Sequence, residues 1–265
     1  MKIQILSDLH NEFLRHSRQN PKHKWDGSIP ETDADIIVLA GDIDTGTQGV
    51  EWAIGESGRL EKPIVYVMGN HEFYTNEYFS LKKKIAQRCH DTDVHCLDCS
   101  LFFMGDVRFI GATLWTDYKS DARTPQDLAM FHAAKTLADH HVITFDSGDA
   151  EKIFQPFDAL TIHKDELDWL EEQLARKFNG KTVVVTHHGP HQVCQHPRFP
   201  VNELTGAFHS DLSSLIDDND IDIWIYGHTH ANLDVVVSDT RIIANQAGYP
   251  GENVPSFNAG LVIEI

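Results

Sequence analysis

Asp, Asn and His recur along this chain at spacings that could hold metal ions. Asp8 and His10 are two residues apart, and so are His228 and His230. On a chain that stays extended, side chains two residues apart share one face and can coordinate one ion together. Carboxylate and imidazole ligands in combination suit Mn, Fe or Zn. The 17 histidines of the sequence also direct attention to metal binding.

Further candidate ligands stand elsewhere in the chain. Asp42 follows a glycine, and its two carboxylate oxygens could bridge two ions. Asn70, next to His71, offers a neutral amide oxygen, which limits the negative charge that would face an anionic substrate. His187 is adjacent to His188, and strand alternation would let only one of the two face a metal. For any one of these residues a turn or a hydrogen-bonded structural role is the better reading, and their joint occurrence favours chemistry.

Five short apolar runs precede these polar residues and are typical of buried strands. They cover residues 3–6, 36–40, 64–68, 183–185 and 221–226. Helices are predicted between them at 49–60, 76–89 and 164–178. Strands that alternate with helices indicate an α/β fold. Sites in open α/β sheets lie beyond the carboxyl ends of the strands, so we expect the five following loops to meet in one crevice.

The remaining segments suggest a second sheet and an insertion. Residues 101–112 and 233–244 read as β-hairpins, with turns at 105–106 and 238–240. Residues 113–163 are predicted to form an insertion near the site, with a helix over 125–140 and a loop over 145–156. The loop around Asn245 and Tyr249 could reach the mouth of the crevice, and 261–265 is a predicted closing strand. Without a linker or repeat, residues 1–265 are expected to form a single domain.

Composition narrows the possible partners. Lys plus Arg is 22 and Asp plus Glu is 40, which gives a net charge of −18. Such a chain should repel extended nucleic acid and anionic membranes. Four cysteines do not make a disulfide framework in a chain of 265 residues, and the single pair Cys96 and Cys99 predicts a strand and a turn. The N-terminal residues show no signal pattern and no apolar run of membrane length, so a cytoplasmic protein is expected.

The motifs, taken in order, resemble those of the calcineurin-like metallophosphoesterase family. They are Asp8-x-His10, Gly41-Asp42, Gly69-Asn70-His71-Glu72, His187 and Gly227-His228-x-His230. The resemblance implies two packed mixed β-sheets flanked by helices, a four-layer αββα sandwich that holds two divalent or mixed-valence metal ions. It implies that one ion is held by Asp8, His10, Asp42 and His230. It implies that Asp42, Asn70, His187 and His228 hold the other.

A pair of cations suits the hydrolysis of phosphate esters, because it can convert a bridging water into hydroxide near neutral pH and clamp the phosphorus during attack. The leaving oxygen needs a proton, and the resemblance makes His71 the candidate donor. Asp44 could orient His71. Asn70 and His188 are the candidate substrate contacts.

The segment around Asp42 limits the choice of substrate. Phosphoprotein phosphatases of this superfamily carry Gly-Asp-x-Val-Asp-Arg-Gly, whereas residues 41–46 are shorter and lack the phosphate-binding Arg. The expected substrate is therefore a small phosphate ester, with phosphodiesters favoured. The alternatives are a phosphomonoesterase or nucleotidase, and a noncatalytic scaffold with the same fold. A complete ligand set together with His71 disfavours the scaffold. The oligomeric state is not predicted.

Overall fold

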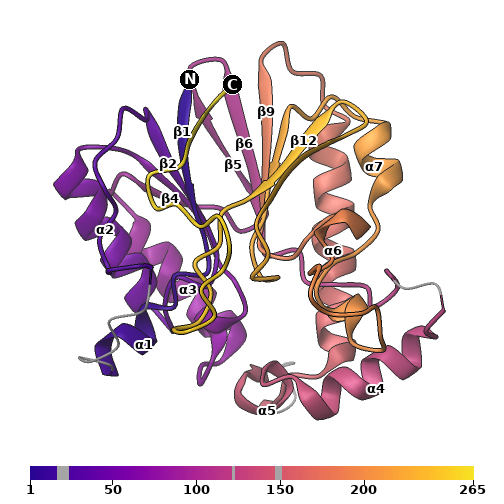
Figure 1. The fold of residues 1–265 in the computed structure, drawn as a ribbon. Coiled ribbons are helices and arrows are strands. Elements are labelled where there is room, and N and C mark those ends of the chain that lie inside the picture. Colours follow the sequence, from indigo (N-terminus) through magenta and orange to yellow (C-terminus); the bar gives the residue numbers. More distant parts are fainter. Residues whose placement is uncertain (17–23, 121–122, 147–150) are drawn as a thin grey trace.

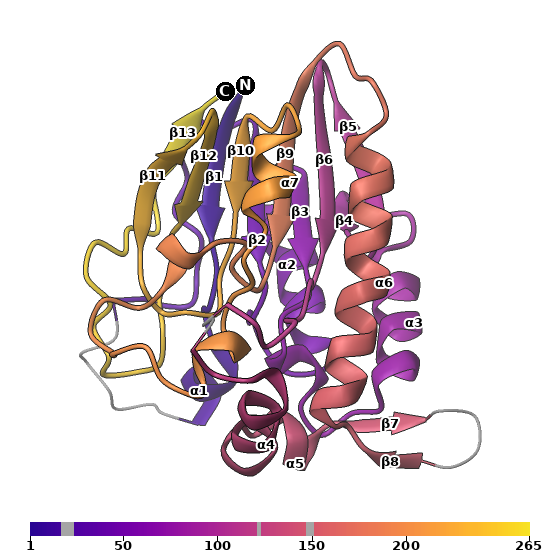
Figure 2. The same cartoon turned by 90° about the vertical axis from the view of Figure 1, so that its right-hand side faces the viewer.

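Two packed β-sheets with helices on both outer faces form the core of the computed structural model (Figure 1). The structure describes residues 1–16, 24–120, 123–146 and 151–265. The amino and carboxyl ends lie side by side at one end of the sheets (Figures 1 and 2). In the described part of the chain, no helix combines the length and apolar composition that a bilayer span requires.

The first sheet has the strand order β13-β1-β2-β3-β4. Its strands are β1 (Lys2–Leu6), β2 (Ile36–Ala40), β3 (Ile64–Val67), β4 (Val94–Cys96) and β13 (Val262–Glu264). Strands β1 to β4 pair in parallel, while β13 runs antiparallel to β1. Because β1, β2 and β3 point the same way, the loops that follow them leave the sheet at one edge.

The second sheet has the order β11-β12-β10-β9-β6-β5. Its strands are β5 (Ser100–Met104), β6 (Val107–Ala112), β9 (Lys181–Thr186), β10 (Ile223–Ile225), β11 (Leu233–Val237) and β12 (Thr240–Ala244). Both predicted hairpins are confirmed, as β5–β6 and β11–β12, and they supply the antiparallel edges. The four central strands, β6, β9, β10 and β12, are parallel.

Three apolar layers hold these elements together. Ile and Val side chains from both sheets fill the space between them, including Val38, Val67 and Val185. The outer face of the first sheet is covered by α2 (Gln48–Leu60) and α3 (Tyr78–Cys89), and that of the second by α6 (Pro156–Leu174) and α7 (Ser213–Asp217) (Figures 1 and 2). The predicted sandwich of two mixed sheets flanked by helices is confirmed.

The region predicted as an insertion contains more structure than expected. The predicted helix over 125–140 is two helices, α4 (Gln126–Thr136) and α5 (Asp139–Val142), because Leu137 is extended between them. The predicted loop over 145–156 includes paired strands, β7 (Thr144–Asp146) and β8 (Glu151–Ile153). Helix α6 begins eight residues before the predicted 164, since Gln155 and Asp158 form a capping box around a proline at the first turn.

Short elements complete the described chain. An unpredicted helix, α1 (Asn11–His16), follows the first motif. Single 3₁₀ turns occur at η1 (His71–Phe73), η2 (Gln192–Cys194) and η3 (Thr205–Ala207).

The close approach of the two sheets gives a stability prediction at Gly111 of β6. A Cβ there would lie 2.5 Å from Leu97 Cβ and 3.0 Å from Val67 Cγ2. Overpacking of a filled core typically costs about 1–3 kcal/mol, so Gly111→Ala should lower the free energy of unfolding by that amount in urea titrations. The control is Gly55→Ala in α2, where a Cβ would meet nothing within 4 Å. That change should raise the free energy of unfolding by about 0.5–1 kcal/mol. Equal free energies of unfolding for the two variants would contradict the packing argument.

Candidate metal centre

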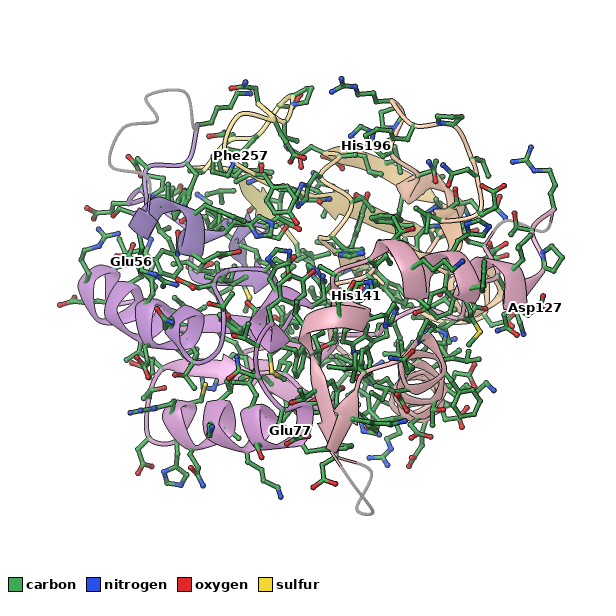
Figure 3. The ribbon with its side chains drawn as sticks, turned by 90° about the horizontal axis from the view of Figure 1, so that it is seen from below. Glu56, Glu77, Asp127, His141, His196 and Phe257 are labelled. Atoms are coloured by element: carbon green, nitrogen blue, oxygen red, sulfur yellow. The ribbon has the colours of Figure 1, made fainter. Side chains whose placement is uncertain are left out.

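The loops that follow β1, β2, β3, β9 and β10 converge at one end of the two sheets, as the alternation of strands and helices predicted. Backbone hydrogen bonds link them, with Asp8 N donating to Gly41 O at 3.0 Å and Gly227 N donating to His187 O at 2.9 Å. Figure 3 views the molecule from this end, where the segments bearing His141, His196 and Phe257 lie. Asp8, His10, Asp42, Asn70 and His187 are buried here, whereas His228 and His230 are partly exposed.

The first group of donors consists of Asp8, His10 and His230, with Asp42 beside it. His230 Nε2 lies 3.1 Å from His10 Nε2 and 3.4 Å from Asp8 Oδ1. His10 Nε2 lies 3.9 Å from Asp42 Oδ2. Ligands bound about 2.1 Å from one ion at tetrahedral angles stand roughly 3–3.5 Å apart. These atoms therefore have the spacing of a single cation site.

The second group consists of Asp42, His187 and His228, with Asn70 beside it. His187 Nε2 lies 3.3 Å from Asp42 Oδ1 and 3.0 Å from Asn70 Oδ1. One oxygen of Asp42 thus faces each group, since Oδ2 is on the side of His10. The geometry is that of a carboxylate between two adjacent cation sites.

Two buried atoms in these groups have no hydrogen-bond partner among the described residues: Asp8 Oδ2 and His228 Nε2. An unsatisfied buried polar atom costs about 1–3 kcal/mol, so such atoms call for an explanation. Both are good metal donors, and each belongs to a different group. Two bound cations would satisfy both atoms, and the residues present therefore fit the metal pair that the motifs imply.

Hydrogen bonds to Nδ1 fix the orientation of three of the histidine rings. The Nδ1 atom of His10 lies 3.1 Å from Glu12, that of His230 lies 2.6 Å from Glu252, and that of His187 lies 2.9 Å from the carbonyl oxygen of Ala40. Each acceptor keeps the proton on Nδ1 and directs the lone pair of Nε2 into the site. Neither glutamate was predicted from the sequence.

The orientation of Asn70 is fixed by the insertion. Its Nδ2 donates to Asp139 Oδ1 at 2.7 Å and to the Tyr74 hydroxyl at 3.2 Å. Its Oδ1 is left facing His187, as a metal ligand requires. Asp139 belongs to α5, so the segment predicted only to border the site also supports one of its candidate ligands.

The backbone conformation that brings Asp8 and His10 together differs from the one predicted from the sequence. We expected a continuing strand to place both on one face, but β1 ends at Leu6. Both residues instead adopt left-handed backbone angles, with φ of 52° and 49°. The remaining members with positive φ are Asp42 at 55°, His228 at 70° and His230 at 50°. Such angles cost about 1–3 kcal/mol each in non-glycine residues, and their clustering is typical of functional sites.

Glu72 holds two of these loops together. It is fully buried, accepts from the backbone nitrogens of Gly69 at 2.6 Å and Ile43 at 2.8 Å, and also accepts from the Tyr66 hydroxyl at 2.7 Å. Burial, followed by the nearby charge of Asp42, raises the pKa of Glu72 to about 7. Gly69 is required by close approach, because a Cβ there would lie 2.2 Å from Asp42 Oδ1.

The electrostatics differ among the buried histidines. Burial, reinforced by neighbouring imidazoles, holds the pKa of His228 and of His188 well below the usual range, so both rings are neutral. Burial also acts to lower the pKa of His187, but the charge of Asp42 outweighs it and raises the value to about 9. A proton and a metal ion compete for the same Nε2 of His187, so a cation at Asp42 would replace that proton.

His188 lies behind the candidate ligands. Its ring centroid is 4.1 Å from that of His228 and 5.4 Å from that of Trp115, and the residue is only 3% exposed. Its proposed substrate contact therefore receives no support from its place in the fold. His188 packs against His228, and its Nδ1 lies 3.4 Å from the carbonyl oxygen of Thr113.

The expected partner of His71 also differs. His71 Nδ1 lies 2.9 Å from Glu12 Oε1, and His71 Nε2 lies 2.8 Å from the hydroxyl of Tyr249. Burial acts to lower the pKa of His71, but Asp42 and Glu12 outweigh it and raise the value. Asp44 was expected to orient this ring, yet its carboxylate is held by the guanidinium of Arg15.

A pocket of about 600 Å³ opens over the candidate ligands. That size suits a ligand considerably larger than phosphate. Its walls include His71, Tyr249 and Phe208, and the segment that carries Arg198 and Phe199. Tyr249 thus does lie at the site, as the loop around it suggested.

Comparison with known proteins agrees with this geometry. The model of the calcineurin-like phosphoesterase family matches residues 1–232. The chain belongs to this family, whose members are metal-dependent hydrolases of phosphoric esters.

Individual proteins are similar to this chain in sequence or in structure. An uncharacterized protein of Acanthamoeba polyphaga mimivirus is 26% identical over 280 residues, which cover 99% of this chain and 96% of that protein. The crystal structure of phosphopantetheinyl hydrolase from Mycobacterium tuberculosis superposes with a TM-score of 0.74 at 15% identity, covering 100% of this chain and 95% of that one. A putative 5'-nucleotidase from Staphylococcus aureus is similar at a TM-score of 0.48 and 17% identity, over 93% of this chain and 49% of that one.

Proposed function

We propose that this protein is a binuclear metal-dependent phosphoesterase that hydrolyses small phosphodiesters. The observation that carries the proposal is the convergence of two donor groups on Asp42, each with one buried atom that has no other partner among the described residues. A noncatalytic scaffold would not need His71 at the mouth of the same site with its Nε2 directed to the pocket wall.

The proposed ligands divide between two positions. Asp8, His10, Asp42 and His230 would hold one ion, and Asp42, Asn70, His187 and His228 would hold the other. When bound, two divalent cations of Mn, Fe or Zn type would lower the pKa of water and offset charge on the phosphoryl oxygens.

The residues of the chain perform the remaining tasks. As water adds to phosphorus and the ester P–O bond breaks, the leaving oxygen takes the proton from His71 Nε2. The water hydroxyl stays on phosphorus, and the second proton of that water replaces the one that His71 gives up. Substrate would displace the Tyr249 hydroxyl from its place 2.8 Å from this nitrogen. The products are an alcohol and a phosphomonoester.

The walls of the pocket favour a diester over a monoester. Among its described lining residues, Arg198 is the one with a permanent positive charge, whereas Asp139 and Glu252 are acidic. A diester carries one negative charge on its phosphate, and a monoester near neutral pH carries up to two. Phe199 and Phe208 add apolar surface that could cover a second ester substituent.

The test compares two esters on protein freed of metal and reloaded with Mn, Fe or Zn. We expect bis(p-nitrophenyl) phosphate to be hydrolysed with a kcat/KM about tenfold or more above that of p-nitrophenyl phosphate, a difference of about 1.4 kcal/mol in activation free energy. The metal-free protein is the control. A preference for the monoester would identify a phosphomonoesterase or nucleotidase instead. If neither ester is hydrolysed with any of the metals, the proposed phosphoesterase activity is excluded.

A further inference from the structure

Glu12 occupies a position that neither the motifs nor the ligand groups assign. One of its two carboxylate oxygens, Oε1, accepts from two rings, His10 Nδ1 at 3.1 Å and His71 Nδ1 at 2.9 Å. The two rings are themselves in contact, with centroids 4.4 Å apart and a near-perpendicular arrangement. The Glu12 side chain is only 12% exposed, so water competes little for these bonds.

The local fold brings Glu12 to this place. After the left-handed residue His10, helix α1 begins at Asn11, and Glu12 lies in its first turn. The backbone nitrogen of Asn11 donates to Ile43 O at 2.9 Å, which ties this turn to the loop that carries Asp42. Glu12 is therefore anchored between the first and second ligand loops, facing the ring of a third loop.

Asp44 cannot serve His71 in the same way. Arg15 Nη2 donates to its Oδ1 at 2.7 Å and Arg15 Nη1 donates to its Oδ2, a paired arrangement that uses both oxygens. The backbone nitrogen of Thr45 donates to Oδ1 as well, at 2.6 Å. A carboxylate held at both oxygens by a guanidinium has a fixed orientation.

We infer that Glu12 is the positioning residue for proton donation: by holding Nδ1 of both His10 and His71, it couples the orientation of a metal-binding ring to that of the proton donor. The inference rests on the proposed function and deepens it. Glu12 touches neither substrate nor metal in this scheme. It acts on the reaction through the two rings that it holds.

The consequence for the proton is specific. With Nδ1–H bound to Glu12, the only ring nitrogen of His71 that can deliver a proton to the leaving oxygen is Nε2. Donation from Nε2 requires the doubly protonated ring, which directs Nδ1–H to Glu12 and Nε2–H to the pocket. Without Glu12 this ring can rotate, so fewer molecules present Nε2–H to the leaving oxygen. Loss of a partner that orients a ring typically costs about 10–100-fold in metal affinity or activity.

Glu252 supplies a matched control. It also accepts from Nδ1 of a candidate ligand in the first group, His230, at 2.6 Å, and it accepts from the backbone nitrogen of Tyr249 at 2.8 Å. Removing either glutamate frees one ring of the first metal position. Only Glu12 also holds the proton donor, so the difference between Glu12→Ala and Glu252→Ala isolates the effect on His71.

The kinetic test uses two substrates that differ in the need for a proton, methyl p-nitrophenyl phosphate and methyl phenyl phosphate. The p-nitrophenolate group leaves readily, whereas phenolate depends more on a donated proton. At saturating metal, Glu12→Ala should lower kcat for the phenyl ester about 10–100-fold and lower kcat for the nitrophenyl ester much less. Glu252→Ala should weaken metal binding but leave the ratio of the two kcat values at that of the unaltered protein.

A second readout does not depend on turnover. Nuclear magnetic resonance of ¹⁵N-histidine-labelled, metal-free protein, with the His71 signals assigned through His71→Ala, reports which nitrogen of the neutral ring carries the proton. We expect Nδ1–H in the unaltered protein and in Glu252→Ala, and a mixture in Glu12→Ala. If Glu12→Ala fails to fold, Glu12→Asp keeps the charge but shortens the reach by one methylene, and should give the same two results in weaker form.

The outcomes separate the two proposals. If the unaltered protein hydrolyses no ester but His71 loses its Nδ1 preference in Glu12→Ala, the proposed function fails while the contact is real. If the unaltered protein is active and Glu12→Ala lowers kcat equally for both esters, the positioning role is overturned. An unchanged His71 proton position in Glu12→Ala would overturn it independently.

Discussion

Replacing His71 with alanine should lower kcat for the phenyl ester by about 10²–10⁴-fold while two metal ions remain bound per chain. The separation follows from the geometry. His71 Nε2 is directed to the pocket and bonds Tyr249, whereas Nε2 of His10, His187 and His230 is directed to the other donors of the two groups. Removing His71 takes away a proton donor and leaves the proposed ligands in place. Metal content by mass spectrometry and steady-state kinetics measure the two parts.

The control for this variant is His90→Ala. The His90 side chain is 77% exposed and pairs with its neighbour Asp91, so the change should affect neither kcat nor metal content. The decisive observation is the pair of results for His71→Ala. Unchanged turnover would remove His71 from the mechanism, and loss of one metal would make it a ligand, a reading compatible with its 4.0 Å distance from Asp42 Oδ2.

Several features of the fold and site could be predicted from the sequence because each rests on a local signal. Short β-branched runs indicated the parallel strands, and the turns at 105–106 and 238–240 indicated both hairpins. Parallel strands end at one edge, so the polar residues after them had to gather there. The mode of convergence was not predictable, since the left-handed angles at Asp8 and His10 are imposed by contacts between loops.

The supporting residues carry no comparable signal. Glu12 and His71 are 59 residues apart in the sequence, Asn70 and Asp139 are 69 apart, and His71 and Tyr249 are 178 apart. Carboxylates usually point to solvent, so nothing in the local pattern distinguishes Glu12 from Asp44. The choice between them depends on where α1 begins and on Arg15, which occupies the other carboxylate. Such contacts follow from tertiary packing alone.

Helix boundaries in the insertion illustrate a related limit. The pattern over 125–140 reads as one helix, yet Leu137 is extended, and Asp139, which accepts from the amide of Asn70, stands on a separate short helix. The signals that begin α6 at Pro156 were present as Gln155, Pro156 and Asp158, and recognition of this capping box would have found the start. The first error is tertiary in origin, and the second is local.

Asp42→Ala is expected to lower both metal content and activity, because Asp42 is the one described carboxylate that faces both donor groups. Its Oδ1 lies 3.3 Å from His187 Nε2 and its Oδ2 lies 3.9 Å from His10 Nε2. Without it, each position keeps at most three of its proposed ligands. We expect metal content to fall from two ions to one or none, and activity to fall by about 10³-fold or more, since bound metal contributes several kcal/mol to such reactions.

Thermal unfolding with and without added Zn²⁺ or Mn²⁺ tests the binding part of this prediction directly. An ion that binds only the folded protein raises Tm, so the unaltered protein should gain stability on addition of metal and Asp42→Ala should gain far less. Asp42→Asn keeps the shape and one oxygen, and it should show the same deficit in smaller measure. Asp127→Ala, on the exposed face of α4 (Figure 3), is the matched control and should respond like the unaltered protein. Two tightly bound metals in Asp42→Ala would contradict a shared carboxylate and, with it, the division of ligands proposed for the whole site.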